Sequence, residues 1–170
     1  VRIDRRPVRI RPATQWGGTY MAEMPGGAGG RRLPLLDVDE ARHRAADAGI
    51  PEHMADLSVF RTLLHQPIAA AAVNGMLHAL LWKGTLDARL RELLIMRIGW
   101  TCGAVYEWTQ HWAAALAVGV PEADVLGVRD WASHDGFDDL DRAVLAATDE
   151  TLADGCVSDP TWEACAAYLD

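Results

Sequence analysis

Residues 84–121 read GTLDARLRELLIMRIGWTCGAVYEWTQHWAAALAVGVP, and this stretch says most about the architecture. Two apolar runs of helical length follow each other, with Thr85 as the expected cap of the first helix and Gly119 as the expected end of the second. The second run carries Glu107 and His111, which lie four residues apart and therefore on one face of a helix. A carboxylate and an imidazole in an otherwise apolar helix predict a polar site within the fold.

Helical start and stop signals continue on both sides of this stretch. Asp37, Ser58, Pro67, Pro121 and Ser158 stand where helices are expected to begin. No segment sustains the period-two alternation that a half-buried strand requires. We therefore predict an all-α fold, a compact helical bundle with helices over residues 38–48, 59–65, 67–83, 86–100, 100–120, 121–132, 137–153 and 160–170.

The chain divides into a short arm and one domain. Residues 1–33 mix Arg, Pro and Gly with few periodic apolar residues, which predicts a flexible or extended N-terminal arm. Residues 34–170 carry the helical pattern and are predicted to form a single domain.

The composition excludes several kinds of partner. The net charge is -8, and no basic stripe with interleaved aromatic residues occurs, so neither nucleic acid nor an anionic membrane is an expected partner. The alanine runs are too short to span a bilayer. A small-molecule substrate is the expected partner instead.

The three cysteines predict a reducing environment. Cys102, Cys156 and Cys165 form no CxxC pair, and no signal-peptide pattern follows the N-terminal arginines. We therefore expect free thiols and a cytoplasmic location.

The polar residues of the central stretch predict proton chemistry. Positions i, i+3, i+4 and i+7 place Ala104, Glu107, Trp108 and His111 on one stripe, and Glu92 lies on the preceding helix. If these groups meet in an apolar cavity, burial and neighbouring charges tune their pKa values toward proton transfer. The alternative is a Glu107–His111 pair on a helix surface, which contributes about 0.3 kcal/mol and has no function.

The same stretch resembles the carboxymuconolactone decarboxylase and alkylhydroperoxidase-D family. The segment RELLIMR, residues 91–97, is similar to the family's entrance helix, and YEWTQH, residues 106–111, to a variant of its active-site helix. The resemblance covers roughly residues 33 to 170. It implies an all-helical fold that assembles as a homotrimer or homohexamer, with active sites close to subunit contacts.

The resemblance also implies site residues. Glu92 falls on the family's glutamate and His111 on its histidine, while the two cysteine positions of the peroxidase members fall on Ala104 and Glu107. Without that cysteine pair, thiol peroxidase chemistry is not expected, because Cys102 has no thiol three residues on. The remaining reading is an acid–base site of the decarboxylase branch, which uses no cofactor.

In this hypothesis His111 is the acid and base, Glu107 orients it or transfers a second proton, and Glu92 acts as a relay. Tyr106 is a candidate donor to an oxyanion. The predicted substrate pocket consists of Trp108, Ala104, His78 and Arg97, although His78 and the tryptophans are more often core residues and Arg97 could instead form an ion pair.

A metal site is a weaker alternative. Glu107 and His111 with Glu92 or His78 could supply ligands, but the Glu-x-x-His and HExxH spacings are absent. No metal is predicted.

Three functions follow from these patterns. The first is a cofactor-free lyase or isomerase acting on a lactone- or enol-type carbonyl compound, in aromatic catabolism or natural-product biosynthesis. The second is a hydroperoxide reductase that uses Cys102, and the third is a non-catalytic assembly module.

Overall fold

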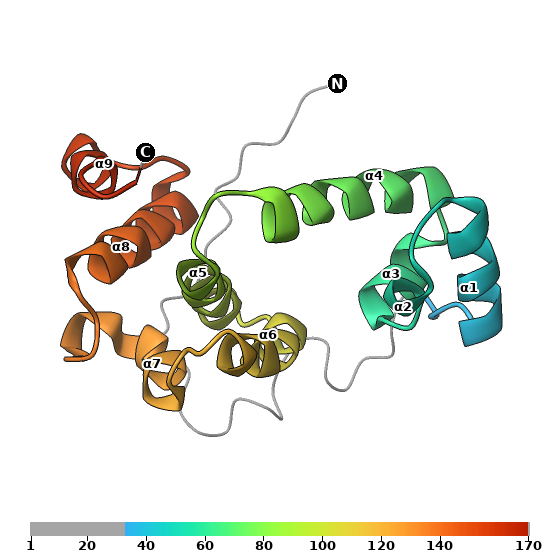
Figure 1. Ribbon diagram of the computed structural model, residues 1–170, viewed down its shortest axis with the longest axis horizontal. Helices are drawn as coiled ribbons and strands as arrows, with labels where there is room; N and C mark the ends of the chain where they lie inside the picture. The colour runs from blue at the N-terminus through green and yellow to red at the C-terminus, as the bar shows by residue number, and fades with distance from the viewer. Residues whose placement is uncertain (1–32, 170) are drawn as a thin grey trace. The chain divides into compact units, whose positions relative to one another are not determined.

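The computed structural model describes residues 33–169, and these residues form helices and turns without a strand. They divide into two compact units, residues 33–85 and residues 86–169 (Figure 1). Each unit has its own cluster of buried apolar side chains.

The first unit contains four α-helices and a π-helical turn. Helices α1 (Val38–Asp47), α2 (Glu52–Ala55) and α3 (Ser58–Leu63) are short, whereas α4 (Pro67–His78) continues into the π-helical turn η3 (Ala79–Lys83). Asp37 caps α1 by accepting a hydrogen bond from the backbone N–H of Asp39 at 2.9 Å. The core of this unit consists of Leu36, Ala41, Ala45, Ile50, Met54, Ala55, Phe60, Leu64 and Ala70.

The second unit begins with two adjoining helices. Helix α5 (Ala88–Thr101) is capped by Asp87 and ends at Cys102, and α6 (Val105–Ala117) follows after Gly103. Gly103 has a φ of 64°, a left-handed conformation that lets the chain reverse between the two helices. The two helices consequently lie side by side (Figure 1).

Four further helical elements complete this unit. They are α7 (Glu122–Gly127), the 3-10 helix η4 (Val128–Ser133), α8 (Asp139–Asp154) and α9 (Asp159–Ala166). A capping box begins α8, because Asp138 accepts from the N–H of Asp141 at 2.8 Å and donates its own N–H to the Asp141 carboxylate. The core consists of Leu93, Met96, Ala115, Val120, Val125, Val128, Phe137 and Leu145.

Two arginine–aspartate pairs join α5 to α8. Arg89 donates to both carboxylate oxygens of Asp141 at 2.6 and 2.8 Å, and Arg97 donates to both oxygens of Asp149 at 2.7 Å. Both pairs join residues 52 positions apart in the chain, so the two helices run parallel and in a constant register.

The structure confirms the all-α prediction and most helix ends. Asp87, not Thr85, caps α5, and Ser58 is the first residue of α3 instead of its cap. The predicted arm over residues 1–33 lies outside the described residues except for Leu33. Residues 34–169 fall into two compact units, so the single domain stays a prediction. Of the helices in residues 33–169, none combines the length and the apolar character needed to cross a bilayer.

Candidate active site

Glu92 of α5 and His111 of α6 form a hydrogen-bonded pair. His111 Nδ1 lies 2.7 Å from Glu92 Oε2. The Glu92 side chain is 4% exposed and that of His111 is 21% exposed, so the carboxylate is inside the unit and the imidazole reaches toward its surface. The two helices can approach closely at Gly99, because a Cβ there would already contact the Trp108 backbone nitrogen at 3.4 Å.

Arg91 is the second partner of the Glu92 carboxylate. Its Nε donates to Glu92 Oε1 at 3.2 Å, and its terminal nitrogen lies at the same distance. Burial alone raises the pKa of Glu92, but the hydrogen bonds and charges of His111 and Arg91 outweigh burial and hold that pKa below its ordinary value. Glu92 is therefore an ionised carboxylate at neutral pH.

An ionised carboxylate determines which ring nitrogen of His111 carries a proton. The carboxylate can only accept hydrogen bonds, so Nδ1 must donate to it. In the neutral imidazole, Nε2 then has the free lone pair and can accept a proton. A histidine hydrogen-bonded through Nδ1 to a buried carboxylate is the arrangement found in hydrolytic triads.

Glu107 lies beside His111 without replacing Glu92 as its partner. Its carboxylate oxygen Oε2 is 3.7 Å from His111 Nε2, which is too long for a hydrogen bond, and its side chain is 46% exposed. The sequence predicted Glu107 as the orienting group and Glu92 as a relay. In the structure Glu92, and not Glu107, is hydrogen-bonded to the imidazole, and the proton-transfer roles of both residues stay predictions.

Tyr106 is at the start of α6 and is 36% exposed. Its predicted role as an oxyanion donor stays a prediction.

Helix α6 as a whole is less buried than its apolar sequence indicated, since Ala115 is its one fully buried residue.

A row of tryptophans runs along α6 from the end of α5. Trp100 and Trp108 have ring centroids 5.7 Å apart, and Trp108 and Trp112 have centroids 6.0 Å apart. Trp108 and Trp112 also pack against the core of the unit. Trp108 therefore supports the fold from the same turn that carries Glu107, and its predicted contact with substrate stays a prediction.

Arg97, one of the predicted pocket residues, binds other groups of its own unit. The Arg97 guanidinium is occupied by Asp149 and by the carbonyl oxygens of Val128 and Arg129, at 2.8 and 3.0 Å. Trp131 Nε1 donates to Asp149 as well, at 2.9 Å. Arg97 therefore forms the ion pair that was the alternative to a pocket role, and its contact with a substrate stays a prediction.

Ala104 is the residue before α6, with non-helical dihedral angles, so it does not continue the stripe of Glu107 and His111. His78 belongs to the unit of residues 33–85, where its ring lies 5.8 Å from that of Trp82.

The sequence reading missed a second carboxylate–histidine pair. His134 Nε2 lies 2.8 Å from Oδ1 of Asp124, a buried residue of α7. Gly127 and Gly136 enclose this ring, because a Cβ at either position would come within 2.7 Å of it. Glycines on both sides of a histidine were the signal that could have revealed this pair.

Residues 67–150 match the carboxymuconolactone decarboxylase family. This part of the chain is a region of the carboxymuconolactone decarboxylase family. The matched segment includes the whole of α5 and α6 and therefore both Glu92 and His111. No curated protein and no solved structure matches the chain significantly.

The partners found for Glu92 and His111 in the described part of the chain are Arg91, Glu107 and each other, and no cysteine is among them. Cys102 is an exposed residue that ends α5, Cys156 is exposed, and all three described cysteines are free. Burial, with a smaller contribution from the Glu150 charge, raises the pKa of the Cys165 thiol. None of the three is placed as the cysteine pair of a family peroxidase would be.

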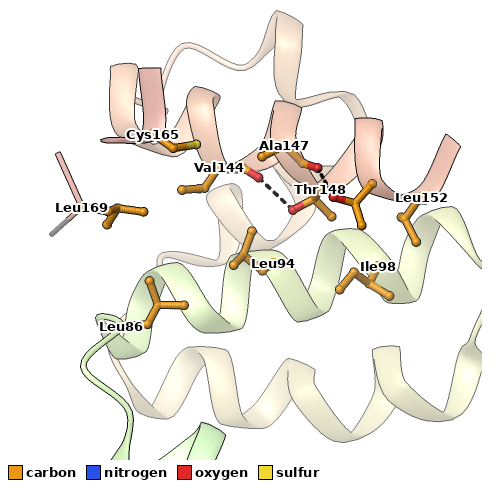
Figure 2. Close-up of a pocket in the computed structure, with 10 residues that line it drawn as sticks. Leu86, Leu94, Ile98, Val144, Ala147, Thr148, Leu152, Cys165 and Leu169 are labelled. Carbon is orange, nitrogen blue, oxygen red and sulfur yellow. Dashed lines mark hydrogen bonds between the residues drawn. The ribbon is translucent and has the colours of Figure 1, made fainter. Parts of the chain in front are cut away.

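The carboxymuconolactone decarboxylase domain also has an apolar pocket of about 340 Å³ between α5, α8 and α9. Figure 2 shows Leu94 and Ile98 facing Val144 and Thr148 across this pocket. The pocket is on the side of α5 opposite Glu92, as the 100° step per residue requires. It lies apart from the acid–base pair.

The donors near His111 do not gather as metal ligands. Within residues 33–169, no group of three or more His, Cys, Asp or Glu side chains is close enough to hold an ion. Glu92 lies beside Nδ1 of the His111 ring and Glu107 lies beside Nε2, so the two carboxylates are next to different ring nitrogens.

Proposed function

We propose that this protein is a cofactor-free acid–base enzyme, a lyase of the decarboxylase type or an isomerase, that acts on a lactone- or enol-type carbonyl compound. The observation that carries the proposal is the 2.7 Å hydrogen bond between His111 Nδ1 and the buried Glu92 carboxylate. The match of residues 67–150 to the carboxymuconolactone decarboxylase family supports the same chemistry.

The proposed reaction moves one proton at a time. His111 Nε2 accepts a proton from the carbon next to the substrate carbonyl, and the electron pair of the C–H bond becomes an enolate. The imidazolium formed is stabilised by the ionised Glu92. His111 then returns the proton to another carbon of the conjugated system, which completes an isomerisation.

In the lyase variant, the carbon–carboxylate bond breaks first and leaves carbon dioxide and a dienolate. Protonated His111 delivers the proton that the dienolate takes up on carbon. Tyr106 is the candidate hydrogen-bond donor to the enolate oxygen in either variant.

The experiment is turnover of butenolides by the full chain, followed by ultraviolet absorbance and by deuterium uptake from D2O. We expect His111→Asn to lower turnover by at least about 100-fold and Glu92→Gln to lower it by about 10-fold or more. Turnover that does not depend on His111 would overturn the proposal.

The chain offers a matched control in its other carboxylate–histidine pair. His134→Asn removes an imidazole bonded to a buried carboxylate at nearly the same distance, so it reproduces the structural cost of His111→Asn. We expect this variant to keep its turnover once circular dichroism has shown it to be folded.

The hydroperoxide reductase is the competing function. It requires a reactive thiol at Cys102, whereas the acid–base proposal predicts that Cys102→Ser leaves turnover within about twofold of the parent protein. Peroxide reduction that Cys102→Ser abolishes would favour the competitor.

A further inference from the structure

The charged side chains around His111 bear on which substrates can reach it. The free nitrogen of the imidazole, Nε2, is the atom at which the proposed chemistry occurs, and Glu107 Oε2 lies 3.7 Å from it. A substrate carbon that reaches Nε2 must therefore approach a carboxylate as well. Any negative charge on that substrate meets a like charge at close range.

Four of the five arginines in residues 86–169 already bind protein acceptors: Arg89 binds Asp141, Arg91 binds Glu92, Arg97 binds Asp149, and Arg142 binds the carbonyls of Trp131, Ala132 and His134. The fifth, Arg129, donates its Nε to the Leu126 carbonyl and lies over the Trp100 ring. A substrate carboxylate would have to displace a protein partner to gain a bidentate contact with any of the first four.

The wider charge balance acts in the same direction. Residues 86–169 contain fifteen Asp and Glu residues against five Arg and no Lys. Such an excess produces a negative potential that disfavours the approach of anions. Glu92 does not add to it locally, since Arg91 and His111 already neutralise and bind it.

The apolar surroundings suit an uncharged molecule. Trp108 and Trp112, with centroids 6.0 Å apart, lie on the helix that carries His111, one residue after Glu107 and one after His111. Both are partly buried, so each presents part of an aromatic ring rather than a polar group.

We infer that the His111 site takes an uncharged lactone or enol-type carbonyl compound, and that Glu107 is the residue that discriminates against carboxylates. The inference rests on the proposed function for the role of Nε2. It narrows the chemistry to proton transfer between carbons, because loss of carbon dioxide needs a carboxylate on the substrate. The carboxylated lactone in the family's name is then a poor substrate for this protein.

The test uses one pair of probes, a β,γ-unsaturated butenolide with a carboxymethyl substituent and the methyl ester of the same compound. The two differ in charge and little in shape. Isomerisation to the conjugated butenolide is followed by ultraviolet absorbance, and binding is followed independently by quenching of tryptophan fluorescence. We expect kcat/KM and affinity for the ester to exceed those for the acid by at least about tenfold at low salt.

Glu107→Gln tests the residue named. It removes the charge and keeps the shape, so we expect the acid-to-ester ratio of kcat/KM to rise by about threefold to tenfold. Glu107→Asp keeps the charge and should keep the ratio low. Glu163→Gln on α9 makes the same change in net charge at another exposed position and should leave the ratio unchanged.

The outcomes separate the two proposals. Equal binding and turnover of acid and ester overturn the charge inference while the acid–base function stands. Binding of the ester in preference to the acid, without turnover that depends on His111, supports the charge inference and overturns the proposed function. A preference for the ester that Glu107→Gln and Glu163→Gln relieve equally overturns the assignment to Glu107.

Discussion

Glu92 combines two opposing environments in one side chain. Burial disfavours its charged form, while His111 and Arg91 favour that form by hydrogen bonds and by charge, and the balance lowers its pKa. The same ionised carboxylate selects the Nδ1–H tautomer of His111 and leaves Nε2 as the base. Stability and proposed function therefore depend on one group.

The lowered pKa of Glu92 predicts a pH-dependent share of stability. A carboxyl group whose pKa is lower in the folded than in the unfolded protein stabilises the fold above its ordinary range, about pH 4.3, and this contribution is lost as pH falls through the folded-state pKa. We expect Glu92→Gln to lower the free energy of unfolding by about 1 to 3 kcal/mol at pH 7 and by less in acid. Urea unfolding of both proteins between pH 7 and pH 3 measures this. The same difference at every pH would contradict it.

Cys165 and the exposed thiols are predicted to react at different rates. Burial and the nearby Glu150 raise the pKa of Cys165, whereas Cys102 and Cys156 are exposed. At pH 8 we expect iodoacetamide to label Cys165 more slowly than the other two, by about fivefold or more. Mass spectrometry of digested protein gives the rates, and labelling in urea should abolish the difference. Equal rates in the folded protein would show that Cys165 is accessible.

At the scale of elements, α5 is packed on more than one side. Its Glu92 and Gly99 side faces α6, the opposite side borders the apolar pocket of Figure 2, and Arg89 and Arg97 bind α8. The acid–base pair is therefore held by a helix with little freedom to shift.

The partly buried Arg97–Asp149 pair is predicted to be costly to break. Arg97→Met would remove the cation from Asp149, leaving it Trp131 Nε1 as a donor, and would leave two carbonyl groups without the Arg97 donor, so we expect a loss of about 3 kcal/mol in the free energy of unfolding. Arg42→Met removes the exposed pair with Asp56 and should cost clearly less. Urea titration of both variants measures the two losses in the free energy of unfolding. Similar losses for Arg97→Met and Arg42→Met would contradict this prediction.

Two glycines are predicted to respond differently to alanine. A Cβ at Gly136 would lie 2.7 Å from Asp124 Oδ1 and from His134 Nε2, so Gly136→Ala should destabilise the protein by about 1 to 3 kcal/mol. A Cβ at Gly99 would make only ordinary contacts, and alanine is the better helix former, so Gly99→Ala should be neutral or slightly stabilising. Thermal unfolding of the two variants tests this contrast. If Gly99→Ala lowered the melting temperature more than Gly136→Ala, the prediction would be contradicted and α5 would pack against α6 too tightly for an added Cβ.

At the scale of the whole molecule, we propose that the protein is a homotrimer or homohexamer. Ile68 is 90% exposed, and Met76, Leu80 and Trp82 of the same continuous helix are exposed too, although all four are apolar. We expect sedimentation to give a trimer or hexamer, and Ile68→Glu with Leu80→Glu to lower its size. His53→Glu, on the exposed surface of α2, is the control. A monomer at every concentration would contradict the proposal.

Much of the fold was readable from local sequence. Asp37 and Gly119 mark helix ends through local backbone preferences and contacts within a few residues, and the structure places helix ends next to them. The same local period placed Glu107 near His111, and resemblance to a family singled out Glu92 and His111.

The partners of the charged side chains depended on packing between distant helices. Glu92 and His111 are 19 residues apart, and Arg97 and Asp149 are 52 apart. The sequence offers several carboxylates as partners for each cation or imidazole. The partner in the structure is the carboxylate that helix packing brings within about 3 Å, because electrostatic attraction weakens with distance and is stronger in a buried environment. Helical period therefore determined the elements and the candidate residues from sequence, whereas the register of α5 against α6 and α8 determined that His111 bonds to Glu92 and Arg97 to Asp149.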